Sequence, residues 1–120
     1  HSESNFPFEK KKGWMDIGLP TGTKDQAYLA TLSQILDSIQ SSLTPDLILF
    51  DAGIDVYTND GLGNLELSIE GIRKRDQLVF EHYRGKNIPI ATVIGGGYSK
   101  DTQELAHRHG LIFESAINYL

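Results

Sequence analysis

Apolar residues recur every three or four positions between Asp25 and Pro45, which is the period of one buried helix face. This apolar stripe consists of Tyr28, Leu29, Leu32, Ile35, Leu36, Ile39 and Leu43. Two more helices are predicted further along the chain. One follows Ser68 as its N-cap and ends near Gly85, and the other opens at Asp101. Glu104, three residues after Asp101, completes the pattern of a capping box.

Residues 47–50 are apolar at consecutive positions, and residues 88–94 are rich in β-branched side chains; turn residues bound both runs. Such runs are typical of parallel strands that are covered on both faces. The glycine-rich and charged stretch before Asp25 predicts loop, with a short strand at 15–19. Residues 51–67, with glycine or asparagine at positions 59, 61, 63 and 64, predict a long ordered loop. We therefore expect two strands, each flanked by helices.

The alternation of helix, strand, helix, strand and helix predicts an α/β fold with a parallel sheet. A chain of 120 residues holds one domain of ordinary size. Two strands do not make a stable parallel sheet, however. Either further strands lie near the N-terminus, or the chain is a piece of a larger sheet. The chain also lacks an initiator methionine, and we favour the second interpretation.

Composition excludes several classes of function. The chain has no cysteine, so disulfides, thiolate metal sites and cysteine nucleophiles are ruled out. Its net charge of −5 and its lack of a basic stripe argue against nucleic-acid binding. No apolar run approaches the ~20 residues of a membrane span. The N-terminus lacks the apolar stretch of a signal peptide, so a cytoplasmic location is expected.

Two polar segments fall at the carboxyl ends of the predicted strands, where open parallel sheets bind ligands. Asp51, Asp55 and Asp60 follow the first strand, and Gly95–Ser99 follows the second. Three nearby carboxylates could hold a divalent cation, but the favoured interpretation is that Asp51 and Asp60 cap loop N–H groups. The three glycines lack the spacing of a phosphate loop or a dinucleotide site. Tyr98 could donate a hydrogen bond to an oxyanion, or could simply pack beneath the loop.

In sequence order, residues 45–55, 60–63, 67–76 and 94–99 resemble the zinc-dependent histone deacetylase family, in particular its acetoin-utilisation and class IV-like members. The resemblance covers nearly the whole chain. It implies a three-layer αβα fold with a parallel sheet of the arginase/deacetylase type. Residues 1–120 would then form the C-terminal portion of a single deacetylase-like domain.

The resemblance also implies roles for individual residues. Asp55 matches the aspartate that ligates the catalytic zinc, and Tyr98 matches the tyrosine that polarises the substrate carbonyl. Asp60 matches a nearby structural acid. The positions that match the substrate tunnel and its floor are Phe6, Leu62, Gly96 and Gly97. The implied reaction is zinc-dependent hydrolysis of acetylated lysine or another acetylated amine.

The sequence departs from the family pattern in one respect. The family uses two adjacent histidines and an Asp-x-His pair, and neither occurs in these 120 residues. The resemblance implies that the remaining N-terminal part of the domain supplies them, so the isolated chain is expected to be inactive. Two alternatives remain open. One is a receiver-like phosphate- or nucleotide-binding module built on Asp51, and the other is a noncatalytic interaction module.

Overall fold

The computed structural model describes residues 1–11 and 13–120. Helices and strands alternate along the chain as the sequence predicts, which confirms the α/β class. The elements are α1 (Asp25–Ser42), β1 (Ile48–Asp51), α2 (Ile69–Tyr83), β2 (Ile90–Val93) and α3 (Thr102–Ile117). No helix in the described part of the chain is both long and apolar enough to cross a bilayer.

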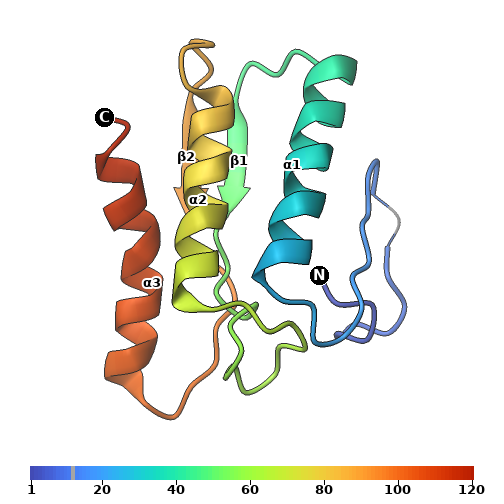
Figure 1. The fold of residues 1–120 in the computed structure, drawn as a ribbon, viewed down its shortest axis with the longest axis vertical. Coiled ribbons are helices and arrows are strands. Elements are labelled where there is room, and N and C mark those ends of the chain that lie inside the picture. The colour runs from blue at the N-terminus through green and yellow to red at the C-terminus, as the bar shows by residue number, and fades with distance from the viewer. Residues whose placement is uncertain (12) are drawn as a thin grey trace.

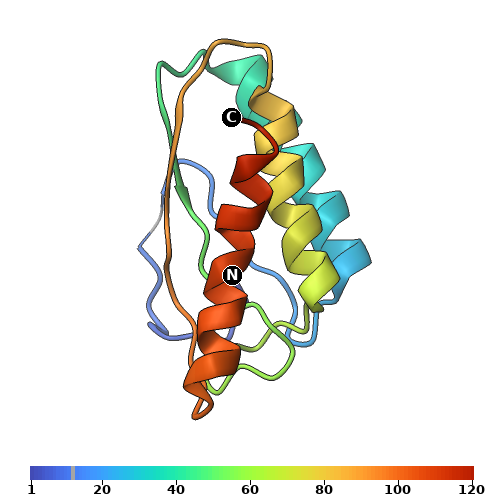
Figure 2. The same cartoon turned by 90° about the vertical axis from the view of Figure 1, so that its left-hand side faces the viewer.

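The two strands pair in parallel, with Ile48 opposite Ile90 and Asp51 opposite Val93. The helices α3, α2 and α1 lie side by side in that order across the molecule (Figure 1). Turned by 90°, the view shows the strands on one side and all three helices on the other (Figure 2). The structure is therefore a two-layer piece of α/β architecture.

The covered face of the sheet packs against aromatic and aliphatic side chains of the helices. Phe50 of β1 meets Phe80 of α2 edge to face, and Phe80 stacks on Tyr119 beyond α3. Nearer the carboxyl ends of the strands, Leu67 and Ile72 are fully buried. This core seats the loops that follow β1 and β2.

The opposite face of the sheet is uncovered, which corrects the expectation that both strands are buried on two faces. Leu49 is 78% exposed and Val93 is 59% exposed. Leu47 and Ile94 are also exposed. The physical reason is that all three helices pack on the other face (Figure 2). Of the three layers expected, the described residues supply two.

The expected strand at 15–19 does not form. Leu19 makes one isolated bridge with Ser2, and the neighbouring apolar side chains Trp14, Met15 and Ile17 are exposed. Within residues 1–11 and 13–120, no other strand segment lies beside 15–19 to extend the pairing. The two-stranded sheet is thus the whole sheet of the described chain.

Side-chain caps fix the starts of α2 and α3. Ser68 Oγ accepts a hydrogen bond from Gly71 N–H, and the Asp25 carboxylate accepts bonds from both the backbone N–H and the hydroxyl of Ser68. Asp101 caps α3 by accepting from the N–H groups of Gln103 and Glu104. These caps agree with the predicted N-termini.

In the predicted capping box at α3, Glu104 does not accept the N–H of Asp101 directly, and Ser99 links the two residues. The N–H of Asp101 donates to Ser99 Oγ at 3.1 Å, and the Ser99 hydroxyl donates to Glu104 Oε2 at 3.3 Å. Ser99 therefore stands between the two ends of the box. As a result, the residues just after Tyr98 are tied to the first turn of α3.

Candidate functional site

The loops after β1 and β2 lie against each other. Ala52 N–H donates to Val93 O, and the N–H groups of Ile54 and Asp55 both donate to Gly96 O, at 2.6 and 3.1 Å. Because the strands are parallel neighbours, their carboxyl ends meet at one edge of the sheet. The two polar segments of the sequence are thus parts of one site.

The close approach of these loops requires glycine at positions 96 and 97. A Cβ on Gly96 would collide with the carboxylate of Asp55. A Cβ on Gly97 would lie 2.5 Å from the side chain of Ile54. A larger residue at either position would displace the side chain that it meets, Asp55 or Ile54, so these glycines permit the close approach of the two loops.

Asp55 carries a partly buried carboxylate in a negative environment. Burial raises the pKa of Asp55, and the nearby negative charges of Asp60 and Asp51 raise it further. The positive charge of Arg75 acts in the opposite direction. A carboxylate whose charge is disfavoured in this way is suited to binding a cation, because the cation offsets both burial and repulsion.

Asp51 and Asp60, by contrast, serve as caps of their own loops. Asp51 Oδ1 accepts a hydrogen bond from Gly53 N–H at 3.2 Å. Asp60 Oδ1 accepts from Leu62 N–H at 2.9 Å and from Gly63 N–H at 2.8 Å. In the described part of the chain, no three His, Asp or Glu side chains converge as a metal site. Of the two interpretations left open for Asp51 and Asp60, loop capping is the one that the structure shows.

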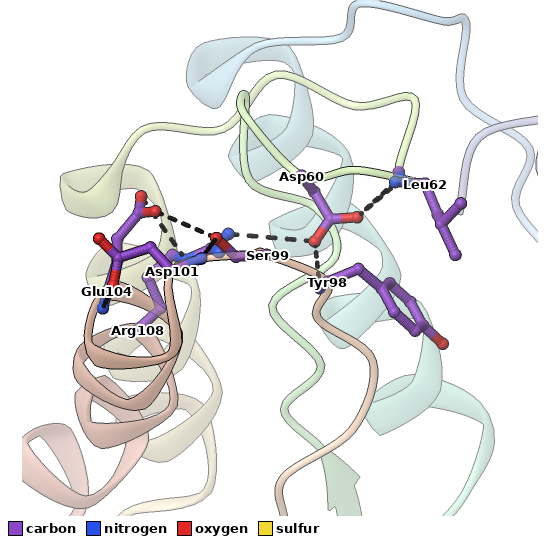
Figure 3. A network of polar contacts seen from close by, with 8 residues as sticks. Asp60, Leu62, Tyr98, Ser99, Asp101, Glu104 and Arg108 are labelled. Carbon is purple, nitrogen blue, oxygen red and sulfur yellow. Dashed lines mark hydrogen bonds and ion pairs between the residues drawn. The ribbon is translucent and has the colours of Figure 1, made fainter.

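The backbone of Tyr98 is held on both sides. Its N–H donates to Asp60 Oδ2 at 2.7 Å, and its carbonyl accepts from Gly61 N–H at 3.1 Å. The side chain of Asp60 is fully buried. The ring of Tyr98 points away from α3, toward the side on which Leu62 lies (Figure 3). Its backbone is therefore fixed while its phenol remains free to contact a ligand.

A shallow pocket of about 400 Å³ lies beside Tyr98. Tyr98 is 49% exposed, so it is not packed beneath the loop, and Leu62 is also exposed. Of the predicted tunnel residues, Leu62 and Gly97 line this pocket, and Gly96 lies next to Asp55. The lining consists of Gly61, Leu62, Gly97, Tyr98, Ser99, Lys100 and Leu105.

Phe6 is placed differently from the other predicted tunnel residues. Its side chain is 84% exposed and meets Phe8 edge to face, and among the described residues it is not part of the pocket lining. The adjacent Asn5 accepts a hydrogen bond from the Asn64 side chain at 2.8 Å. That bond holds the N-terminal loop against the loop of Leu62. The tunnel role of Phe6 remains a prediction.

Sequence reasoning missed Arg75, which lies beneath the Asp55 loop. Its side chain is almost fully buried and pairs with the fully buried Asp76 at 2.8 Å. It also donates to the carbonyls of Gly53 and Ala52, at 2.5 and 3.3 Å. The sequence did hold a signal, because positions 75 and 76 fall on the buried face of α2 between Ile72 and Val79.

The fold with its joined strand-end loops is that of the deacetylase class. A solved HDAC homologue from Aquifex aeolicus superposes with a TM-score of 0.77 and 28% identity, over 95% of this chain and 32% of that chain. An HDAC homologue complexed with SAHA gives a TM-score of 0.72 and 26% identity, with the same coverage of both chains.

The model of the histone deacetylase domain matches residues 3–111, and the chain belongs to this family. It is 34% identical to histone deacetylase 2 of Arabidopsis thaliana, over 89% of this chain and 30% of that protein. It is 40% identical to an uncharacterised protein of Picosynechococcus, over 97% of this chain and 39% of that protein. The chain therefore spans about two fifths or less of these relatives. The family resemblance and the fold class expected from the sequence are confirmed.

Members of the family are in general zinc enzymes, so the donor set can be compared with what zinc needs. A catalytic zinc takes three protein ligands and an open position. The partly buried carboxylate of Asp55, with its raised pKa, suits one of these ligands. The described residues do not bring three ligands together. Among the described residues, Asp55 therefore suits one zinc ligand, and no group of three ligands makes a complete zinc site.

Proposed function

We propose that residues 1–120 form the C-terminal portion of a zinc-dependent deacetylase domain that hydrolyses acetylated lysine or another acetylated amine. In this proposal Asp55 is a zinc ligand and Tyr98 is the oxyanion donor. The supporting observation is the direct hydrogen bonding of the Asp55 loop to Gly96, two residues before Tyr98. This contact brings a carboxylate and a phenol from different strands to one edge of the sheet.

Tyr98 has the properties that an oxyanion donor needs. Its backbone is fixed by Asp60 and Gly61, while its phenol is half exposed beside the pocket. A preorganised donor stabilises the negative charge that develops on the amide oxygen during hydrolysis. Zinc, when bound, polarises the same carbonyl and activates water.

The apolar parts of the pocket suit the alkyl chain of an acetylated amine. Leu62 and Leu105 line the pocket together with the ring of Tyr98. An uncharged acyl group on a hydrocarbon chain gains free energy from such a lining. The proposed substrate is therefore a flexible amine with an acetyl group at its end.

The general acid/base and two further zinc ligands are proposed to come from the N-terminal part of the domain. The sequence contains no adjacent histidines and no Asp-x-His pair. With Asp55 as its single zinc ligand, the isolated 120-residue chain is expected to show no deacetylase activity. Metal-dependent turnover of an acetyl-lysine substrate by the isolated chain with added zinc would contradict this.

The receiver-like alternative has little support. Its phosphate acceptor would be Asp51, and Asp51 is occupied in capping Gly53 N–H beside Gly95. The match to the histone deacetylase domain covers the same residues. The deacetylase function is the one that the site favours.

The direct test uses two variants of the full-length protein. Tyr98→Phe should lower kcat by about 10²- to 10³-fold with unchanged zinc content, because one oxyanion donor is lost. Asp55→Ala should instead lower the bound zinc, measured by metal analysis. Tyr119→Phe is the matched control, since this phenol bonds Glu81 at the far end of α3. A Tyr98→Phe enzyme with the wild-type rate would refute the proposed role of Tyr98.

A further inference from the structure

Arg108, on α3, is the largest fully buried side chain of the described residues. None of its three guanidinium nitrogens has a hydrogen-bond partner among those residues. An arginine cannot lower the cost of burial by losing its proton. A buried charge of this kind calls for an explanation in terms of the charges around it.

Two acids and one aromatic ring surround the guanidinium. Nη1 lies 3.9 Å from Asp60 Oδ2, and Nε lies 3.9 Å from Glu104 Oε1. The centre of the guanidinium is 4.7 Å from the ring centroid of Tyr57, the distance of a cation–π contact. Arg108 is therefore held by charge and by the ring, without direct hydrogen bonds.

Both acids hold the loop that carries the phenol. Asp60 accepts the N–H of Tyr98, and Glu104 accepts the hydroxyl of Ser99 (Figure 3). Arg108 thus faces two carboxylates whose other contacts fix consecutive residues of one loop.

We propose that Arg108 is a positioning residue for Tyr98, acting through Asp60 and Glu104. This inference rests on the proposed function. The side chain of Asp60 is completely buried, and a buried carboxylate needs a countercharge to keep its place. Without Arg108 the acid would lose that countercharge and hold the Tyr98 N–H less firmly. The phenol would then be displaced from the oxyanion.

The test is kinetic and uses the full-length protein with its zinc. Arg108→Met should lower kcat by about 10- to 100-fold, because a displacement of about 1 Å has an effect of this size. KM and zinc content should change by less than about threefold, since substrate binding and the Asp55 ligand are untouched. Arg108→Lys should recover a part of kcat, because it restores the charge. Arg73→Met is the matched control, since Arg73 joins α2 to Glu114 of α3 at the surface.

A double-mutant cycle separates positioning from general destabilisation. In a Tyr98→Phe background, Arg108→Met should lower kcat by less than about threefold, because the phenol that it positions is already gone. An equal fall in both backgrounds would overturn the inference. The inference would also be overturned if Arg108→Met kept the wild-type kcat while Tyr98→Phe lost activity as expected. That result would not contradict the proposed function.

A second variant covers the case in which Arg108→Met does not fold. Asp60→Asn keeps the shape of the side chain and removes the charge that Arg108 faces. It should give the same fall in kcat and the same loss of effect in the Tyr98→Phe background. A wild-type kcat of Asp60→Asn would overturn the inference. A wild-type rate of Tyr98→Phe itself would overturn the proposed function together with it.

Discussion

Two buried arginines lie beneath the two loops of the site, and their surroundings differ. Arg75, under the Asp55 loop, donates hydrogen bonds to Asp76 and to two backbone carbonyls. Arg108, near the Tyr98 loop, has two carboxylates at 3.9 Å and an aromatic ring. Arg75 therefore fixes its loop through direct bonds to the backbone. Arg108 acts indirectly, through Asp60 and Glu104, which bind Tyr98 and Ser99 of its loop.

The two sets of contacts suggest that Arg75 contributes mainly to stability and Arg108 mainly to activity. Hydrogen bonds to a charged group that is buried contribute directly to folding. A buried charge without hydrogen bonds contributes little to folding and can even be unfavourable. We therefore expect loss of Arg75 to reduce stability and loss of Arg108 to reduce activity.

The largest effect on stability is expected for Arg75→Met in the full-length protein. Burial already raises the pKa of Asp76, and the Arg75 charge offsets a part of that rise. Removing Arg75 leaves the Asp76 carboxylate buried and unpaired, and leaves the carbonyls of Ala52 and Gly53 without their donor. The free energy of unfolding, measured with urea, should fall by about 3–5 kcal/mol.

Arg108→Met is the matched control for this measurement. It removes no direct hydrogen bond, and Asp60 keeps three backbone N–H donors, so the loss of stability should be clearly smaller than in Arg75→Met. The double variant Arg75→Met/Asp76→Leu should recover much of the stability lost in Arg75→Met, because it removes the unpaired acid as well. Equal losses for Arg75→Met and Arg108→Met would remove the distinction between the two arginines.

A smaller effect is expected at His82, a partly buried basic residue of α2. Burial lowers the pKa of His82, the positive charge of Lys86 lowers it further, and Asp37 opposes the shift. Its Nε2 has no partner among the described residues. Unlike an arginine, a histidine can lose its proton, and so can avoid the cost of a buried charge.

The sign of the pH dependence follows from the lowered pKa. The unfolded chain takes up the proton of His82 more readily than the folded protein does. The contribution of His82 to stability is complete above its unfolded pKa, and is lost as the pH falls toward its folded pKa. Between pH 7.5 and 5, His82→Gln should therefore lose less stability than the wild type, by less than about 1 kcal/mol. The exposed His107→Gln is the control, and an unchanged pH slope in His82→Gln would contradict the expectation.

Local patterns in the sequence predicted the helices and their caps. Ser68 and Asp101 were identified as N-caps because their side chains satisfy N–H groups only two or three residues away. The exposure of Leu49 and Val93 was not predictable in this way. Which face of a strand is covered depends on the side on which distant helices pack, and no local pattern records that.

The candidate site was predictable in part. The parallel strands explain why the Asp51 and Gly95 segments meet. The sequence left open whether Asp51 and Asp60 bind a cation or cap their loops, and the structure shows capping, because nearby N–H groups bind both carboxylates. Arg108 was also missed, although it lies three and four residues before the buried Leu111 and Ile112. A charged residue on the apolar stripe of a helix is a signal of a buried ion pair.

The central claim is that Asp55 and Tyr98 serve one zinc ion at the carboxyl edge of the sheet. Crystals of the full-length protein, measured at the zinc absorption edge, test it most directly. We predict an anomalous difference peak about 2.0–2.2 Å from a carboxylate oxygen of Asp55, with the phenol of Tyr98 facing the same cavity. A zinc peak held entirely by other residues, with Asp55 unbound or Tyr98 turned away from it, would contradict the claim.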